Sequence, residues 1–293
     1  LNSKLINAIN NDQCIFVIND ATEGSIWTKW EIRKFQGWLK EANIQSEKVI
    51  VITQNYNYAY NTFPFKMVVW NFYESFCRDT LEDWIETDID AKKFLCLNRL
   101  PHHQKFYFMY QMYKHGILDQ FNYSIGKKIE NQKTIEEYDQ WGLWEWNDDM
   151  SKFAKTTPHK YDLNLWEHIS SPTWLYPHHK KNNLLYIVTE TFYNNYMLEG
   201  RYRDVSEKTW KPIALQMPFI MIHTPFALKR LRDLGYKTFH NIWDESYDDI
   251  KDDRDRMKAI VDLVVYLNNR TDFRAMIDSC REIVEHNFSI LKR

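Results

Sequence analysis

The feature that most constrains the fold of this chain is a repeated alternation of short apolar runs with longer amphipathic segments. The runs CIFVIND (14–20), KVIVITQN (48–55) and FKMVVWNF (65–72) have the length of buried strands. Between the first two lies TKWEIRKFQGWLKEAN (28–43), whose aromatic residues recur near one helical face. Short apolar runs separated by helices are typical of parallel strands covered by helices. The first third of the chain is therefore predicted to be an α/β unit.

The same alternation returns at KFLCLNR (93–99), which is predicted to be a strand. A helix is expected over residues 102–116, closed by Gly116, because glycine readily adopts the left-handed conformation that ends helices. Further strands are predicted at 182–191 and 218–223, with a short last strand at YKTF (236–239). An acidic loop at 243–255 leads into two helices near 254–268 and 272–291.

A length of 293 residues exceeds one typical domain, which favours two domains. The charged stretch DTLEDWIETDIDAKK (79–93) is typical of a surface or linker, so a boundary is predicted near residue 92. The expected organisation is a Rossmann-like domain over 1–92 and a second over 93–293, with a tryptophan-rich insertion around 127–181. Two such α/β domains are expected to face each other across a cleft.

Composition excludes several classes of protein. The formal net charge of −2 gives no general attraction to nucleic acid or to anionic lipid, and no run of about 18 apolar residues predicts a transmembrane helix. The four cysteines lie far apart without a CxxC pair, which indicates buried thiols in a reducing compartment and not a disulfide framework or zinc site. A cytoplasmic location is expected.

Polar residues gather where the predicted strands of the second domain end. In open α/β sheets, ligands bind outside the carboxyl ends of the strands. The helix start DVSEKTW (204–210) adds main-chain N–H groups, which attract anions. A carboxylate suits ribose hydroxyls, whereas cations and helix N–H groups suit a pyrophosphate. The residues predicted to form a nucleotide-diphosphate pocket are Arg99, Lys105, Glu190, Asn194, Ser206, Glu207, Lys208 and His223.

The segments YIVTETFYNN and DVSEKTWKPIALQMPFIMIHTP together resemble the donor-binding segment of the α-1,3-fucosyltransferase family. Ser206, Glu207 and Lys208 match a Thr-Glu-Lys motif of that family, and Glu190 matches a glutamate that precedes Asn-Ser. The segments are also similar to glycosyltransferase-like proteins of large bacteriophages and related viruses, which share the SEKTWKPI run and a strand end like CLNRL. The resemblance covers 93–125 and 183–245.

The resemblance implies a GT-B fold in which the C-terminal domain holds a nucleotide sugar and the N-terminal domain holds the acceptor. It implies an inverting glycosyltransferase that moves a sugar from a nucleotide-diphosphate donor, for example a GDP-sugar such as GDP-fucose, to a glycan hydroxyl. Glu207 would hold the ribose and Lys208 the phosphates. The family has an arginine where this chain reads PHHQK, so His103, Lys105 or Arg99 is expected to take its place. Pro212 is expected to kink the helix or to free the carbonyl of Lys208.

Inversion needs a general base within hydrogen-bond reach of the acceptor hydroxyl. In an enzyme of this type the base would come from the N-terminal domain. Glu74 follows the strand MVVWNF (67–72) and is preferred, with Glu23 and Asp20, near the end of CIFVIND, as alternatives. Carboxylates at the positions of Glu74 and Glu23 are more often ordinary loop residues than bases.

Neither a metal nor another cofactor is expected. The adjacent histidines of the two PHH runs at 101–103 and 177–179 have poor ligand spacing, and the DID at 88–90 lies in the charged linker. The tryptophans at 141–146 would stack on acceptor sugars or pack in a core.

The sequence is also compatible with two other functions. One is a viral transferase that glycosylates DNA bases in the host cytoplasm, although no Lys/Arg-rich block favours nucleic acid. The other is a non-catalytic protein that keeps the fold and binds a glycan or a partner.

Overall fold

The structure is a computed structural model that describes residues 3–20, 29–53, 65–69, 74, 77, 85–126, 144, 146–161, 176–194 and 205–293. The chain forms two compact units. The first comprises Leu1–Tyr73 with Met197–Asp204, and the second Glu74–Tyr196 with Val205–Arg293. Both contain a parallel sheet, which confirms the predicted α/β class. The sequence placed a boundary near residue 92, whereas the compact units divide after Tyr73.

The first unit contains a three-stranded parallel sheet in the order β1-β2-β3. The strands are β1 (Phe16–Asp20), β2 (Val49–Thr53) and β3 (Lys66–Val69), and the helices are α1 (Ser3–Asn10) and α2 (Lys29–Glu41), with a short 3-10 helix η1 (Ser46–Lys48) before β2. Val49 and Val51 of β2 pack with Leu39 of α2 and Ile9 of α1. The strands and the helix predicted from the apolar runs are confirmed within a few residues.

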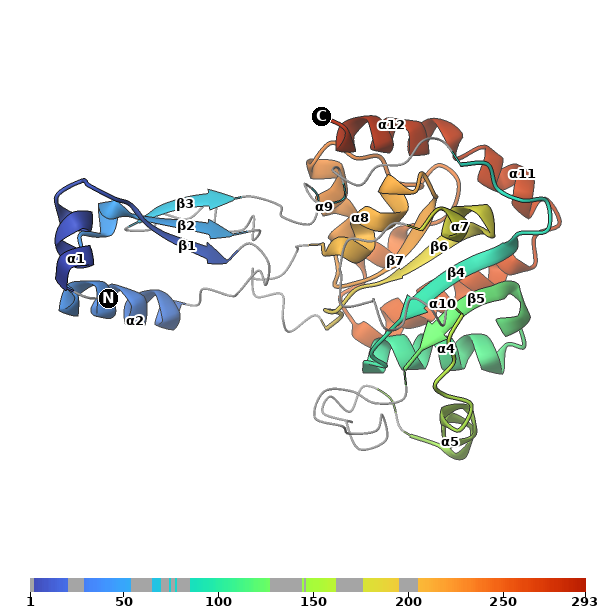
Figure 1. The fold of residues 1–293 in the computed structure, drawn as a ribbon. Helices are drawn as coiled ribbons and strands as arrows, with labels where there is room; N and C mark the ends of the chain where they lie inside the picture. The colour runs from blue at the N-terminus through green and yellow to red at the C-terminus, as the bar shows by residue number, and fades with distance from the viewer. Residues whose placement is uncertain are drawn as a thin grey trace. The chain divides into compact units, whose positions relative to one another are not determined.

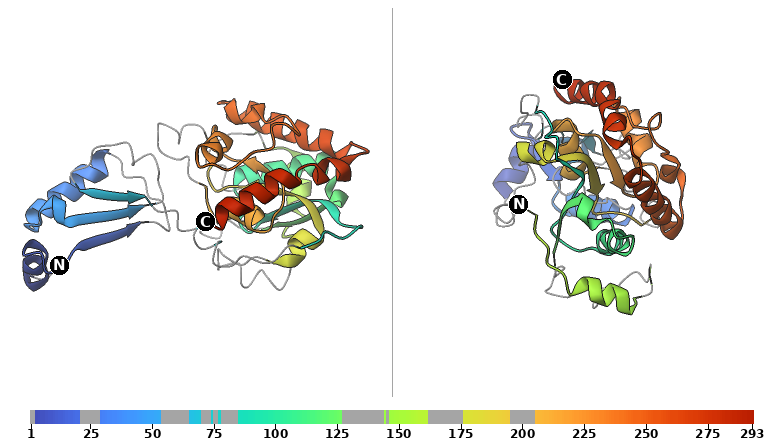
Figure 2. Two further views of the ribbon diagram at one scale, coloured as in Figure 1. Left: turned by 90° about the horizontal axis from the view of Figure 1, so that it is seen from above. Right: turned by 90° about the vertical axis from the view of Figure 1, so that its right-hand side faces the viewer.

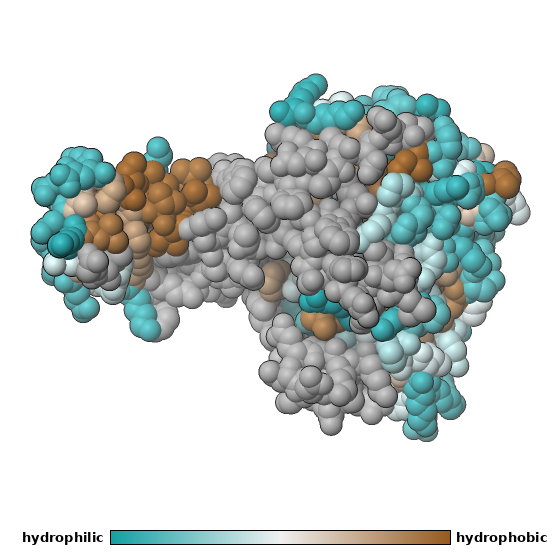
Figure 3. Space-filling model, viewed as in Figure 1, coloured by the Kyte–Doolittle hydropathy of each residue, from teal (hydrophilic) through white to brown (hydrophobic). Residues whose placement is uncertain are grey.

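The side chains of β1 alternate between the two faces of this sheet. Phe16 and Ile18 pack against the core, whereas Val17 is 48% exposed and the neighbouring Ile15 is 63% exposed. Hydrophobic residues accordingly gather on the surface of this unit (Figure 3). The packed face is the one that meets α1 and α2, so in the described part of this unit the core lies on one side of the sheet.

The second unit contains a four-stranded parallel sheet in the order β5-β4-β6-β7. The strands are β4 (Lys92–Asn98), β5 (Phe121–Ile125), β6 (Asn183–Thr189) and β7 (Phe219–Ile222). The chain first adds β5 on one side of β4 and then β6 and β7 on the other. The order therefore reverses between β4 and β6, as at the switch point of a doubly wound α/β fold. Strand β5, FNYSI, was not predicted from the sequence.

Helices cover both faces of the second sheet (Figures 1 and 2). Helix α4 (His103–Lys114) packs against α10 (Asp253–Asn268) on one face, and α8 (Glu207–Ala214) packs against α12 (Arg281–Leu291) on the other. The physical reason is the handedness of the crossovers. The connections β4-α4-β5 and β6-α8-β7 run in opposite directions across the sheet, so right-handed crossovers place their helices on opposite faces.

The central strand β6 is buried at every position, and the neighbouring Phe94 and Leu95 of β4 are fully buried. Helix α4 ends as predicted, because Gly116 has a left-handed φ of 69°. The remaining elements of this unit are η3 (Leu118–Gln120), α5 (Asp148–Ala154), α7 (Pro177–Lys181), α9 (Ala227–Asp233), η7 (Ser246–Asp249) and α11 (Phe273–Asp278). None of the helices within the described ranges is long and apolar enough to cross a membrane.

Two predicted elements differ in the structure. The YKTF run is not a strand, because the side chain of Asn287 takes both main-chain groups of Lys237, accepting from its N–H at 2.7 Å and donating to its carbonyl at 2.9 Å. The helix predicted over 272–291 is divided into α11 and α12. At the break, the Ser279 hydroxyl donates to the carbonyl of Met276 at 2.6 Å, a local hydrogen bond that competes with helix continuation.

Candidate functional site at the carboxyl edge of the second sheet

The switch point between β4 and β6 lies at the carboxyl edge of the second sheet, and side chains join the two strands there. The buried Asn98 at the end of β4 accepts a hydrogen bond from the hydroxyl of Thr189 at the end of β6. On the other side of β4, the Gly126 N–H donates to the carbonyl of Asn98 at 3.1 Å. A Cβ at Gly126 would lie 2.0 Å from the carbonyl oxygen of Arg99, so only glycine allows this approach. The edge is therefore a fixed platform.

Glu190 follows β6 directly and is 2% exposed. Its carboxylate accepts from the Ser206 N–H at 3.0 Å, from the Ser206 hydroxyl at 2.6 Å and from the Thr209 hydroxyl at 2.7 Å. Burial would raise the pKa of Glu190, but the nearby Lys208 and His223 and these hydrogen bonds lower it below its ordinary value. The carboxylate is thus ionised, and its hydrogen bonds connect the start of α8 to the end of β6.

Helix α8 begins at Glu207, and Ser206 is its N-cap. The Ser206 hydroxyl accepts from the Lys208 N–H at 3.3 Å. The Lys208 ammonium donates to Glu207 Oε1 at 2.8 Å, to Ser206 Oγ at 3.0 Å and to Thr191 Oγ1 at 3.3 Å. The helix continues through Pro212 to Ala214. The second residue of the helix therefore holds a cation at an end that already carries partial positive charge.

Lys105, in the first turn of α4, is the second cation of this edge and is only 4% exposed. Burial and the neighbouring Lys208 lower its pKa to about 7, against the opposing influence of Glu190, Glu207 and Cys96. No acceptor for its ammonium lies within hydrogen-bond distance in the part of the chain that the structure describes. A buried ammonium beside a second ammonium is unfavourable by itself, and an anion is the group that would relieve it.

Two further residues of the α4 start belong to this edge. Burial and the nearby Lys105 and Lys208 lower the pKa of His102 to about 4, which keeps its ring neutral near pH 7. Gln104, which sequence reasoning missed, donates to the carbonyls of Glu190 and Thr191, each at 3.0 Å. It anchors the start of α4 to the segment after β6. We call the group formed by Lys105, Glu190, Ser206, Glu207 and Lys208 the sheet-edge site.

Arg256 of α10 was also missed, although it connects the ends of two strands. It is 1% exposed and donates to the His223 carbonyl at 3.0 Å and to the Tyr193 carbonyl at 2.5 Å. Its guanidinium lies 4.3 Å from the centre of the Tyr193 ring. A lone arginine among the apolar positions of a helix was the signal available in the sequence. Through Arg256, the segments that follow β6 and β7 are held together.

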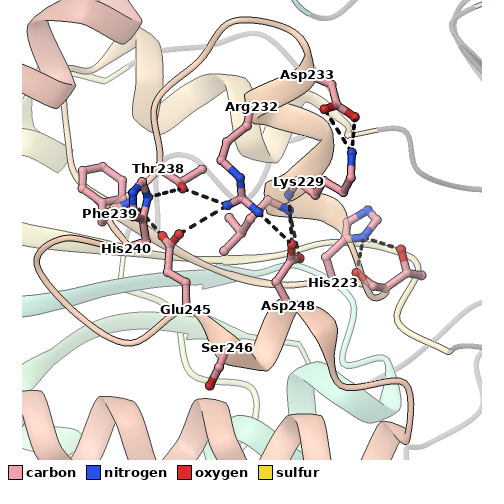
Figure 4. A network of polar contacts seen from close by, with 12 residues as sticks. His223, Lys229, Arg232, Asp233, Thr238, Phe239, His240, Glu245, Ser246 and Asp248 are labelled. Atoms are coloured by element: carbon pink, nitrogen blue, oxygen red, sulfur yellow. Dashed lines mark hydrogen bonds and ion pairs between the residues drawn. The ribbon is translucent and has the colours of Figure 1, made fainter.

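His223, predicted to end this strand, directly follows β7 and is 3% exposed. Its Nδ1 lies 2.6 Å from the hydroxyl of Thr224 (Figure 4). In the same view, Arg232 lies between the buried carboxylates of Glu245 and Asp248, at 3.6 and 3.7 Å. Burial raises the pKa of both carboxyls. Asp248 accepts from the first N–H groups of α9 as well, so this network fixes the loop after β7.

Asn194 and Arg99 are the other predicted donor residues. Asn194 is 9% exposed and follows Tyr193 in the segment held by Arg256. Arg99 is exposed just beyond β4, and no hydrogen bond of its side chain reaches the described members of the sheet-edge site. The structure thus brings together Lys105, Glu190 and the start of α8, with His223 near enough to influence the charge of Glu190.

The predicted general bases are placed only in part. Glu74 belongs to the second unit, and its Oε1 accepts from the Tyr236 hydroxyl at 2.6 Å. The Tyr236 ring in turn packs on Trp210 of α8, with ring centres 5.3 Å apart. Glu23 lies outside the described residues. Asp20 is the last residue of β1, but its side chain also lies outside the described part of the structure. Glu74 is thus held next to the helix that begins with the sheet-edge site.

The metal and aromatic motifs lie elsewhere. The DID at 88–90 precedes β4 and is therefore at the amino end of the sheet, opposite the sheet-edge site. No group of three or more potential ligands occurs among the His, Cys, Asp and Glu residues that the structure describes. Trp146 stacks on Phe106 at 5.3 Å between ring centres, and Trp144 stacks on Tyr107 at 4.1 Å. These two tryptophans pack against α4, while Trp141 lies outside the described residues.

No family model, no curated protein and no solved structure matches the chain. The function of the site therefore has to be inferred from its own residues. Chemically, the sheet-edge site offers two ammonium groups, one of them on a buried side chain and without an acceptor in the described part of the chain, at the switch point of an α/β sheet and beside a helix start.

Proposed function

We propose that the protein is an inverting glycosyltransferase that holds a nucleotide-diphosphate sugar at the sheet-edge site. The observation that carries this proposal is the position of Lys105. Its side chain is buried, its ammonium has no acceptor among the described residues, and it lies near Lys208 at the switch point of a parallel sheet. Ligands of open α/β sheets bind at this place, and two ammonium groups suit two phosphates.

The charges of the site favour a diphosphate over a single phosphate. Lys208 is 26% exposed and partly balanced by Glu207, whereas Lys105 has only more distant carboxylates around it. A diphosphate can place one phosphate near each ammonium. When the sugar leaves, negative charge grows on the diphosphate oxygens, and preplaced cations stabilise that charge without reorganisation. The fixed cations would do this without a metal.

Glu207 and Glu190 have different roles in this proposal. One oxygen of Glu207 accepts from Lys208, and the other has no partner among the described residues, so it is available to a ribose hydroxyl. Glu190 was expected to contact the donor, but both of its oxygens are engaged with Ser206 and Thr209. It supports the pocket by holding α8 in place.

The acceptor side follows from the resemblance to GT-B fucosyltransferases. In that arrangement the first unit would bind a glycan hydroxyl, and the two units would face each other across a cleft. Glu74 is the proposed general base. It belongs to the second unit and is held by Tyr236 beside α8, so its carboxylate has a fixed position from which to take the acceptor proton.

A thermal-shift panel of nucleotides and nucleotide sugars tests the proposal, because a ligand that binds only the folded protein raises the melting temperature. We expect nucleoside diphosphates and their sugars, GDP among them, to raise Tm, and the sugar of the best donor to be transferred to a glycan acceptor. The matched control is Lys208→Met, which should lose most of the shift. A panel without any stabilising diphosphate would contradict the proposal.

A further inference from the structure

Lys105 differs from an ordinary phosphate-binding lysine because charged groups approach its ammonium from every element packed around it. Lys208 on α8 opposes its charge, and carboxylates and a thiol favour it. The groups are Cys96 on β4, Glu190 after β6, and Glu207 and Lys208 on α8, with the neutral ring of His102 at the start of α4 nearby. The two carboxylates are already engaged, Glu190 by Ser206 and Glu207 by Lys208. No acceptor is therefore left at hydrogen-bond distance from Lys105 within the described residues.

We propose that Lys105, whose buried side chain has no acceptor among the described residues, is largely a neutral amine in the ligand-free protein and takes up a proton when a diphosphate binds. Lys105 would thus determine both the charge of the ligand that is accepted and the pH range in which it binds. This inference rests on the proposed donor site and adds its regulation. The step is balanced, since the amine gains one proton from solvent and the resulting ammonium donates a hydrogen bond to a phosphate oxygen.

The pH dependence of binding follows from the pKa of Lys105 in the ligand-free protein and in the diphosphate complex. Burial and Lys208 lower the pKa of Lys105 to about 7 in the ligand-free protein. A diphosphate adds negative charge beside the amine, and an opposite charge raises the pKa of an amine. Binding therefore prefers the protonated form. Below about pH 7 the ammonium is already present, whereas above it each pH unit should weaken binding by up to tenfold, until pH reaches the raised pKa of the complex.

The decisive measurement is calorimetric titration of the whole protein with GDP at pH 8, in two buffers of different ionisation enthalpy. The phosphates of GDP are fully ionised at this pH, because their second ionisation lies near pH 6. We expect uptake of close to one proton per GDP bound, and an affinity that falls by up to tenfold between pH 8 and pH 9. Binding without proton uptake, or no binding of GDP at either pH, overturns the inference.

Three variants test whether Lys105 is the group that takes up the proton. Lys105→Met keeps the length of the side chain without its charge, and it should bind GDP at least tenfold more weakly at pH 7, with no proton uptake at pH 8. Lys208→Met should weaken binding and also reduce proton uptake at pH 8, because a cation that lowers the pKa of Lys105 is gone. Lys258→Met, at an exposed position of α10, is the matched control and should behave like wild type. Undiminished proton uptake by Lys105→Met would contradict the assignment. If that variant does not fold, the wild-type proton count decides.

Transfer of the sugar is measured separately, on the same preparation, so that the two proposals can fail independently. Sugar transfer without proton uptake overturns the role of Lys105 and leaves the proposed function standing. Proton uptake with GDP in a protein that transfers no sugar from any donor supports the role of Lys105 and counts against the glycosyltransferase.

Discussion

The Glu190 carboxylate accepts both the main-chain N–H of Ser206, at 3.0 Å, and its hydroxyl, at 2.6 Å. This contact joins the end of β6 to the N-cap of α8 across an intervening segment of the chain. A carboxylate at a helix N-terminus also interacts favourably with the partial positive charge there. The position of Lys208, in the first turn of α8, therefore depends on the buried Glu190.

Replacing Glu190 by glutamine should destabilise the protein by about 1–3 kcal/mol, because a buried amide cannot accept the three hydrogen bonds in the same way. The measurement is urea denaturation at pH 7, with Glu207→Gln as the control that changes a partly exposed neighbour. The folded pKa of Glu190 is depressed, so its stabilisation is present above the pKa of the unfolded chain and is lost as pH falls through the folded pKa. Wild type should therefore lose more stability than Glu190→Gln on acidification. Equal free energies of unfolding at pH 7 would argue against the contact.

Lys208→Ala and Lys208→Gln should cost far more activity than stability. Loss of one electrostatic contact to a developing anion costs roughly 10²–10³ in rate in comparable sites. The ion pair between Lys208 and Glu207 is partly exposed, so its loss should change the free energy of unfolding by no more than about 1 kcal/mol. Steady-state transfer and a denaturation curve for each variant check both statements, with Lys258→Ala as control. A variant that unfolds, or one that turns over like wild type, would reduce the SEKTW run to a helix cap.

Glu74→Gln should lower transfer by about 10²–10⁴-fold with little change in GDP affinity, because a general base acts on the acceptor and not on the donor. Tyr236→Phe removes the hydroxyl that donates to Glu74 at 2.6 Å and should give a smaller loss of the same kind. Transfer rates and GDP titrations of both variants make the test. Full activity in Glu74→Gln would exclude Glu74 as the base and direct attention to Asp20 and Glu23.

Transfer should survive EDTA. The proposed mechanism balances the leaving diphosphate with Lys105 and Lys208, and the DID lies at the opposite edge of the sheet from them. The assay compares initial rates in EDTA and in added manganese or magnesium. A rate that collapses in the chelator and returns with manganese would show that the metal-independent assignment is wrong.

Much of the fold could be predicted because the buried strands are continuous apolar runs with polar ends. This pattern gave the strands at 16–20, 49–53, 92–98 and 183–189 within a few residues. Strand β5 was not predicted, because FNYSI contains the polar residues Asn122 and Ser124 and is therefore not a continuous apolar run. The YKTF segment failed for the opposite reason. Its composition suits a strand, but Asn287, far away in sequence, takes its main-chain groups.

The site shows the same limits. The polarity at strand ends predicted that Ser206, Lys208 and Lys105 lie at one edge of the sheet, because the topology of a parallel sheet brings strand ends together. The partners within that edge could not be predicted, because hydrogen-bond geometry depends on the packing of α4 and α8. Glu190 was predicted to bind the donor from its place at a strand end, and its hydrogen bonds to Ser206 and Thr209 could not be foreseen. Gln104, which holds the start of α4 through two carbonyls of the next strand end, gave no signal at all.

The most direct test of the central claim is a comparison of GDP and GMP by calorimetric titration of the wild-type protein at pH 7. If Lys105 and Lys208 address two phosphates, the second phosphate adds at least one charge-assisted hydrogen bond, worth about 1.5–3 kcal/mol. GDP should therefore bind at least tenfold more tightly than GMP, and Lys208→Met should remove most of this difference. Equal affinity for GDP and GMP, repeated with the diphosphates and monophosphates of the other bases, would contradict the assignment of the sheet-edge site.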